Sequence, residues 1–308
     1  MVIAIVVALA GCDGAVAEQA TGSQARTMLA QLPEQRGLAA RYPGDKGLAA
    51  DPAVVLADDF ESSTRPWDRA MGGAKILDEP PHAHVGQRAL ELTTSGPGGG
   101  GVIKYLSPGF DRLFLRYYIK YDEAFPGAHH VGGVMSARAT GVPDANPGVI
   151  PNGTNQFDVL LDHWSFDPKF PPPGQLVAYV YHMDQQHEWG EQFYPSGRTS
   201  PGVNAARGIF GRSFVPRTDF IPARGRWYCF ELMTQANTPG QRDGRLAFWV
   251  DGRLAADFPN LRFRTVDALK LNRVGVTIYE SRNNGLHRVW IDDVVVATTY
   301  IGPMITDQ

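Results

Sequence analysis

Residues 225–252 read GRWYCFELMTQANTPGQRDGRLAFWVDG, and this stretch decides the fold class. Two runs, residues 227–235 and 245–250, are rich in aromatic and β-favouring residues and predict strands. The connection between them contains a Pro-Gly and an Asp-Gly dipeptide. Both are strong turn signals, because Pro presets φ and Gly supplies positive φ. Asp251-Gly252 closes the second strand and predicts the start of another hairpin.

Strand patterns recur through the rest of the chain, with turn signals between them. They lie at residues 54–61, 88–93, 102–106, 112–121, 156–164, 175–183, 272–280 and 287–298. No long helical pattern, fixed-period repeat or second domain is evident, although residues 95–101 form a Gly-rich loop and residues 185–222 have no clear period. Regular short strands with turns between them predict one all-β sandwich domain, which we place at residues 53–308.

Composition limits the classes of partner. The chain has 308 residues, 43% of them hydrophobic and 20% charged, which are values of a globular protein. Its formal net charge of -3 argues against nonspecific nucleic-acid binding, but a locally basic groove could still bind an anionic ligand. We expect a monomer.

The N-terminus predicts export. An apolar run ends in Leu9-Ala10-Gly11-Cys12, a lipobox in which Cys12 is lipidated, so residues 1–12 are interpreted as a lipoprotein signal peptide. A simple secretory signal that contains a Cys is the alternative, since no Lys or Arg precedes the run. We expect a bacterial lipoprotein, periplasmic or at the cell surface, that meets the membrane only through its anchor. A Cys12→Ala variant that stays in the membrane fraction would contradict this.

Residues 13–52 lack strand patterning and are predicted to form a tether, partly helical over residues 24–40. With Cys12 lipidated, Cys229 has no partner for an intrachain disulfide. A lone Cys in a strand is usually a small buried hydrophobe.

The string N-T-P-G-x-x-D-G-x-L-x-x-W-x-D-G at residues 237–252 resembles the core of the alginate-lyase-type polysaccharide lyases of family 14 and, more distantly, the glucuronan lyases. The resemblance runs from about residue 58 to the C-terminus and is fair at residues 114–125 and 288–296. It implies a concanavalin A-like β-jelly-roll with a groove for an acidic, uronate-containing polysaccharide. It also implies cleavage by β-elimination without a catalytic cofactor.

Such a lyase must neutralise the uronate carboxylate, remove the neighbouring proton and protonate the leaving oxygen. Tyr179 and Tyr181 are the first candidates, because residues at i and i+2 of a strand share one face. The resembling family carries a catalytic Y-x-Y pair at the matching place. Without the resemblance, a pair of rim or core aromatic residues is the simpler interpretation.

His129 and His130 are the second candidates, in a predicted loop before Gly132-Gly133. The family has a catalytic Lys in this region, whereas this chain has none between Lys120 and Lys169. A neutral histidine near its ordinary pKa is a plausible replacement base. A solvated pair of loop histidines, or a metal site that lacks a third ligand, is the alternative.

Further residues are candidates for substrate binding. Arg138 offers a bidentate fork for a carboxylate, although it could equally be a surface arginine. Side chains that could contact a glycan chain, several of them as aromatic platforms, are Asp162, His163, Trp164, Trp189 and Tyr194.

Acidic residues near both ends of the domain suggest a structural calcium. First and last strands of jelly rolls often pair, which would bring Asp59 and Glu61 close to Asp293. Oxygen-rich clusters suit Ca²⁺. Solvated turn acids are the alternative interpretation.

Two other functional classes compete. A glycoside hydrolase commonly carries E-x-D-x-x-E on one strand, and the sequence contains no such string. A non-catalytic glycan-binding surface lipoprotein needs only aromatic platforms and no base, so it is the main alternative.

Overall fold

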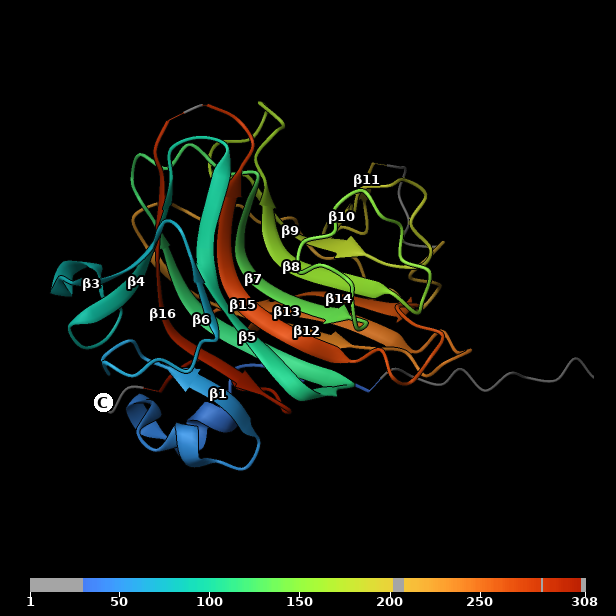
Figure 1. Cartoon of the computed structure of the whole chain (residues 1–308), viewed down its shortest axis with the longest axis horizontal. Helices are drawn as coiled ribbons and strands as arrows, with labels where there is room; N and C mark the ends of the chain where they lie inside the picture. Colours follow the sequence, from blue (N-terminus) through green and yellow to red (C-terminus); the bar gives the residue numbers. More distant parts are fainter. Residues whose placement is uncertain (1–29, 202–207, 284, 306–308) are drawn as a thin grey trace, which may run out of the picture. The chain divides into compact units, whose positions relative to one another are not determined.

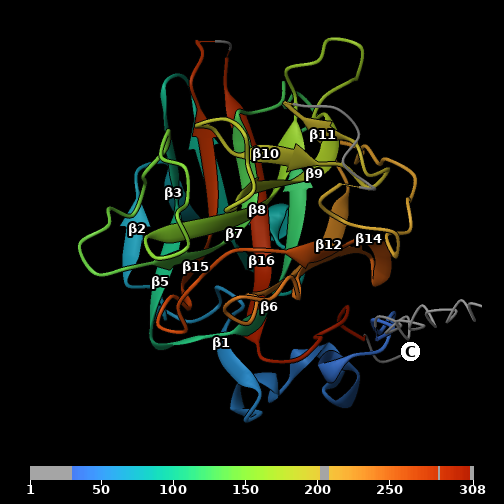
Figure 2. The ribbon, with the colours of Figure 1, turned by 90° about the vertical axis from the view of Figure 1, so that its right-hand side faces the viewer.

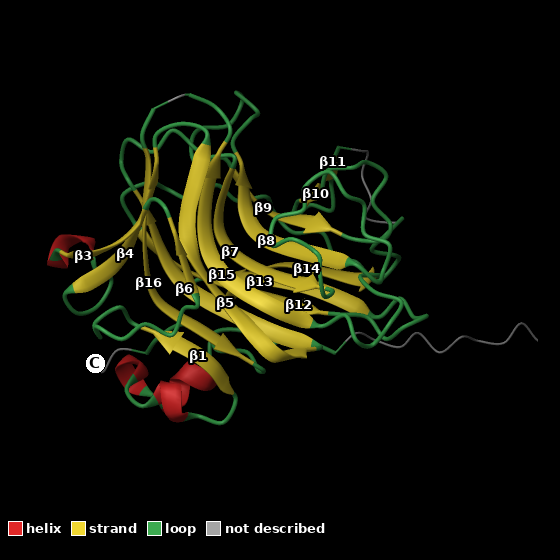
Figure 3. Cartoon of the chain, in the orientation of Figure 1, coloured by secondary structure: helices red, strands yellow, loops and turns green. Residues whose placement is uncertain are grey.

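Two antiparallel β-sheets form the protein in a computed structural model, which describes residues 30–201, 208–283 and 285–305 (Figure 1). One compact unit begins at Gln31 and contains all of the strands. Strands dominate it, and its helical pieces are short 3₁₀ turns, as Figure 3 shows. These turns are η1 (Leu38–Arg41), η2 (Pro43–Asp45), η3 (Leu48–Ala50) and η4 (Pro80–His82).

The first sheet contains the predicted hairpin. Its strand order is β14 (Arg253–Leu261), β13 (Gly244–Val250), β12 (Trp227–Gln235), β6 (Arg112–Tyr121), β16 (His287–Ala297), β4 (Arg88–Thr94) and β3 (Ala74–Asp78). A further strand, β1 (Val54–Asp58), also pairs with β16. The expected pairing of the first and last strands is therefore confirmed.

The second sheet lies against the first, and the two layers are visible in Figure 2. Its strand order is β11 (Thr199–Ser200), β10 (Glu191–Phe193), β9 (Gln175–Tyr181), β8 (Gln156–Trp164), β7 (His130–Arg138), β15 (Leu271–Glu280), β5 (Gly98–Phe110) and β2 (Arg69–Met71). Strands β7 to β11 lie side by side in their sequence order, whereas β7 with β15, β15 with β5 and β5 with β2 become neighbours only through tertiary folding.

The core lies between the sheets because each strand turns alternate side chains inward. On β6, Leu115 and Tyr117 are fully buried in it, and on β8, Phe157 and Val159 are. All four belong to one continuous apolar cluster. The predicted all-β sandwich with a single domain is thus observed.

The central hairpin folds as predicted. β12 and β13 pair over six residues, with Leu232 opposite Phe248, and β14 follows after the Asp251-Gly252 turn. Cys229 on β12 is buried and is a free thiol. Burial raises the pKa of this thiol to about 12, which agrees with its predicted inert role.

Residues 31–52, which the sequence assigns to the tether, are part of the folded unit. Leu38 and Leu48 are buried in a second apolar cluster with Trp249 and Tyr300. The predicted lipobox and Cys12 lie outside the described residues. None of the helices within residues 30–305, gaps aside, has the length and hydropathy of a membrane span.

Candidate functional site

A groove of about 670 Å³ lies on the outer face of the second sheet, the face turned away from the first sheet. The alternation along β7 gives its orientation. Val131 and Met135 enter the core, so His130, Val134 and Arg138 face outward, and all three line the groove. The sequence places His130 in a loop, whereas it begins β7. The groove is also lined from β2, β5, β8, β9 and β15.

The two candidate tyrosines come together in this groove. Ala178 and Val180 of β9 are in the core, so Tyr179 and Tyr181 face outward, and both line the groove. Their ring centroids are 5.6 Å apart, and the Tyr179 hydroxyl points at the Tyr181 hydroxyl across 3.5 Å. The backbone N–H of Gly190 donates to the Tyr179 hydroxyl at 3.0 Å. Burial, followed by the hydrogen bond to Tyr181, raises the pKa of Tyr179 far above its ordinary value. Tyr179 therefore keeps its proton at neutral pH.

His130 lies beside the tyrosines and is held from behind by Asp162. Its ring centroid is 4.7 Å from that of Tyr179. Its Nδ1 lies 2.6 Å from Asp162 Oδ2. Asp162 is 3% exposed and is not among the residues that line the groove. The prediction that Asp162 touches substrate is thus corrected, because the side chain lies behind His130.

His129 has a different environment although it is the adjacent residue. It stacks on His130 at 4.3 Å between ring centroids, and its Nδ1 lies 2.9 Å from Ser281 Oγ. Burial, and then the neighbouring His130, lower the pKa of His129 to about 4. His129 is therefore neutral at neutral pH and forms one wall of the groove.

Arg138 lines the groove, but its guanidinium is already saturated. Nε donates to Pro143 O, Nη1 donates to the carbonyls of Ala137 and Phe157, and Nη2 donates to Asp144 O and Asp158 Oδ1. Those five hydrogen bonds use every N–H that an arginine has. The predicted carboxylate clamp is therefore wrong for Arg138, which instead fixes the loop after β7.

Arg273 on β15 is the groove cation that sequence reasoning missed. In the described part of the chain it makes one hydrogen bond, from Nη1 to Asp144 O at 2.9 Å, and its Nε is buried without a partner. No carboxylate within the described residues forms an ion pair with it. Burial lowers the pKa of Arg273 from its very high ordinary value, and the group stays protonated. Its Nη2 makes no hydrogen bond within the described residues and is not among the buried unpaired atoms, so this end of the guanidinium can donate to an anion.

Other groove residues were also missed, among them Tyr279, Asp144, Asn146 and Asp158. Tyr279 is 42% exposed, and its ring lies 5.6 Å from that of His129. The sequence did contain a signal for the outward-facing residues of this strand, since Arg273, Thr277 and Tyr279 alternate with core residues along β15. The alternation does not say which sheet β15 joins.

Of the predicted aromatic platforms, Trp189 lies in the groove and is 52% exposed. Trp164 ends β8 beside Phe166 and is not among the lining residues. Tyr194 is fully buried under the guanidinium of Arg198, 3.4 Å from its ring centroid. His163 is also buried, with Nε2 2.9 Å from the Tyr121 hydroxyl. Tyr194 and His163 are therefore core residues, contrary to the prediction.

The three predicted calcium ligands do not meet. Among the described residues, no three or more His, Cys, Asp or Glu side chains form a group that could hold a metal ion. Glu61 accepts hydrogen bonds from the backbone of Gln87 and Arg88, and Asp293 contacts His84 Nδ1 at 2.7 Å. Asp59 accepts the backbone N–H of Glu61. Asp59 thus braces its own turn, whereas Glu61 and Asp293 hold segments that are distant in the sequence.

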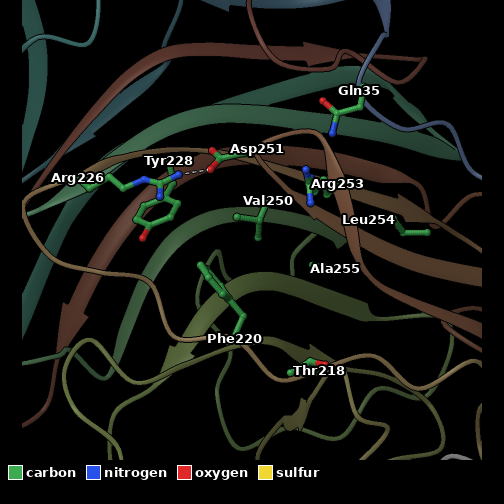
Figure 4. A pocket seen from close by; sticks show the side chains of 10 residues that line it. All are labelled: Gln35, Thr218, Phe220, Arg226, Tyr228, Val250, Asp251, Arg253, Leu254 and Ala255. Carbon is green, nitrogen blue, oxygen red and sulfur yellow. Dashed lines mark hydrogen bonds and ion pairs between the residues drawn. The ribbon is translucent and has the colours of Figure 1, made fainter.

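A second hollow, of about 850 Å³, lies by β12, β13 and β14 (Figure 4). Arg226 there is paired with Asp251 at 2.5 Å, and the Tyr228 hydroxyl accepts the Ala223 N–H. None of the candidate catalytic residues lines it. The groove on the second sheet is therefore the candidate active site.

Comparison with known proteins agrees with this architecture. No family model and no curated protein matches the sequence. The alginate lyase vAL-1 from Chlorella virus matches in structure with a TM-score of 0.56 at 13% identity, over 80% of this chain and 99% of that one. The two chains therefore share the β-jelly-roll fold.

A second solved structure shares this fold. The endo-β-1,4-glucuronan lyase from the fungus Trichoderma reesei matches with a TM-score of 0.51 at 16% identity, over 80% of this chain and 95% of that one. The jelly-roll predicted from the hairpin string is thus confirmed, although so little of the sequence is shared.

Proposed function

We propose that this protein is a polysaccharide lyase that cleaves an acidic, uronate-containing polysaccharide by β-elimination. One observation carries the proposal: Tyr179, Tyr181 and His130 face one groove, with Arg273 on a nearby strand of the same face. Structures that share the fold are an alginate lyase and a glucuronan lyase, which favours this reaction class.

The reaction requires two proton transfers. A base removes the proton at C5 of the uronate, the electron pair forms the C4=C5 double bond, and the C4–O glycosidic bond breaks. An acid then protonates the leaving oxygen. His130 and Tyr181 are the two groups that we assign to these steps. Tyr179 keeps its proton, and its hydroxyl is directed at Tyr181, where it stabilises negative charge on that oxygen.

Arg273 is the group that we assign to the substrate carboxylate. Its guanidinium, through Nη2, neutralises that charge, which makes the adjacent C5 proton more acidic. The exposed ring of Trp189 provides a face on which a sugar ring can stack. Export and lipid attachment at Cys12 remain part of the proposal, as predicted from the sequence.

The test is the Tyr181→Phe variant. Loss of one acid–base group typically costs about 10²–10⁴-fold in rate, so the variant should lose nearly all activity while its melting temperature stays close to that of the wild type. Activity is followed as ultraviolet absorbance of unsaturated product from alginate, glucuronan and other polyuronates. Tyr228→Phe, in the second hollow, is the matched control and should retain the full rate.

Two results would contradict the proposal in different ways. If no substrate in the panel yields product while one of the glycans binds, the protein is a glycan-binding lipoprotein, as in the alternative above. If product forms and Tyr179→Phe and Tyr181→Phe both keep the full rate, the reaction class stands and the tyrosines are not the catalytic pair.

A further inference from the structure

We infer that Asp162 is a positioning residue that sets the tautomer of His130, so that Nε2 is the basic nitrogen presented to the substrate. The inference rests on the proposed function for its catalytic consequence. Its structural part concerns the location of one proton and stands without any activity.

The geometry around Asp162 defines which atoms donate. Oδ1 accepts the backbone N–H of Val131 at 2.9 Å and that of His163 at 2.7 Å. Oδ2 lies 2.6 Å from His130 Nδ1. A carboxylate is ordinarily ionised at neutral pH. An ionised carboxylate can only accept, so Nδ1 of His130 carries the proton.

The consequence follows from the chemistry of imidazole. In the neutral ring one nitrogen donates and the other accepts. When Nδ1 is protonated, Nε2 carries the lone pair, and only that nitrogen can take a proton from substrate. Other groups around the ring do not take over this task. His129 stacks on it, Tyr179 packs against it with the ring planes tilted by 34°, and Tyr279 lies 6.2 Å away between centroids.

Asp162 also orients the ring. The carboxylate is buried on β8, and His130 opens β7, 32 positions away in sequence. The backbone N–H of Val131 binds the same carboxylate, so the start of β7 and the side chain of His130 are fixed together. This arrangement leaves the imidazole little freedom to turn away from the tyrosines.

The Asp162→Asn variant makes a sharp test. The two backbone N–H groups require the amide oxygen at the position of Oδ1, which turns the amide NH₂ towards His130. That NH₂ donates to Nδ1, so the ring proton moves to Nε2 and the lone pair leaves the substrate side. The equivalent change in a serine protease leaves the geometry intact and lowers kcat about 10⁴-fold.

The experiment uses the full chain with ¹⁵N-labelled histidine at a pH where the ring is neutral. Long-range ¹H–¹⁵N spectra identify the protonated nitrogen, and His130→Gln assigns the signal. We expect Nδ1–H in the wild type and Nε2–H in Asp162→Asn. Against the polyuronate that the protein cleaves, kcat should fall about 10²–10⁴-fold with KM within about threefold. Asp257→Asn, which removes a carboxylate paired with Arg245 on the first sheet, should change neither reading.

The outcomes separate the two proposals. An Nε2–H signal in the wild type, or an unchanged tautomer in a folded Asp162→Asn, overturns this inference. If Asp162→Asn does not fold, the wild-type spectrum still decides. Absence of lyase activity in the wild type contradicts the proposed function and leaves the tautomer assignment intact.

Discussion

At the scale of single residues, His130 and His163 show how one side chain type takes two roles. Both lie next to Asp162, His130 through its ring and His163 through its backbone N–H. The His163 ring points to the opposite side of β8, into the core, where Nδ1 has no hydrogen-bond partner among the described residues. Burial outweighs the nearby Asp162 and lowers the pKa of His163 to about 4.

This depressed pKa predicts acid sensitivity. In the unfolded chain a histidine titrates near pH 6.5. Between pH 6.5 and 4, His163 is therefore protonated in the unfolded state and neutral in the folded state. Stability is then fully present above pH 6.5 and is lost as the pH falls, by at most about 1.4 kcal/mol per pH unit. In urea unfolding at pH 7 and pH 5, His163→Phe should show a drop in unfolding free energy about 1–2 kcal/mol smaller than the wild type.

His129 also has a pKa lowered to about 4 and contributes to acid sensitivity in the same pH range. The same unfolding experiment on a variant of His129 separates its contribution from that of His163. If His163→Phe and the wild type lose the same free energy between the two pH values, His163 is not the acid-sensitive group.

At the scale of elements, β7 is a strand that the sequence did not predict. Gly132 and Gly133 interrupt the β-favouring pattern, and glycine is poor in strands, so residues 130–138 gave no clear signal. The structure gives a reason for Gly132. Its φ is +137°, and a Cβ there would lie 2.3 Å from Leu161 O and 2.8 Å from the Tyr117 hydroxyl. The strand passes so close to β8 and the core that a side chain does not fit.

Gly132→Ala should therefore destabilise the protein by about 2–4 kcal/mol, from backbone strain and overpacking together. The measurement is chemical unfolding, compared with Gly72→Ala. Gly72 has open space around its would-be Cβ, so this control should stay within about 0.5 kcal/mol of the wild type. Equal stability of the two variants would mean that β7 can shift to accept a methyl group.

At the scale of the whole molecule, residues 31–52 belong to the fold. The backbone N–H of Leu38 donates to Tyr300 O at 3.0 Å, and Trp249 Nε1 donates to Pro33 O at 2.8 Å. Asp45 pairs with Arg116, which is completely buried on β6. The segment thus covers apolar side chains of the first sheet and neutralises a buried charge.

A chain that starts at residue 53 should lose at least about 4 kcal/mol of unfolding free energy against one that starts at residue 31. Burial of Leu38 and Leu48 contributes about 1.5–3 kcal/mol each, and removal of Asp45 leaves a buried guanidinium without its carboxylate. Equilibrium unfolding of the two chains measures the difference. Equal stabilities would show that residues 31–52 are a tether, as the sequence suggested.

Local sequence was sufficient for the parts of this protein that depend on local rules. Turn dipeptides placed the hairpin of β12 and β13, and the two-residue period placed Tyr179 and Tyr181 on one face. Tertiary structure alone decided which strands far apart in the sequence became neighbours. It set β7 between β8 and β15, brought Asp162 behind His130, saturated Arg138 and left Arg273 open. The physical reason is that a side chain's face follows from the pleat of its own strand, whereas strand order and register follow from packing between segments far apart in the chain.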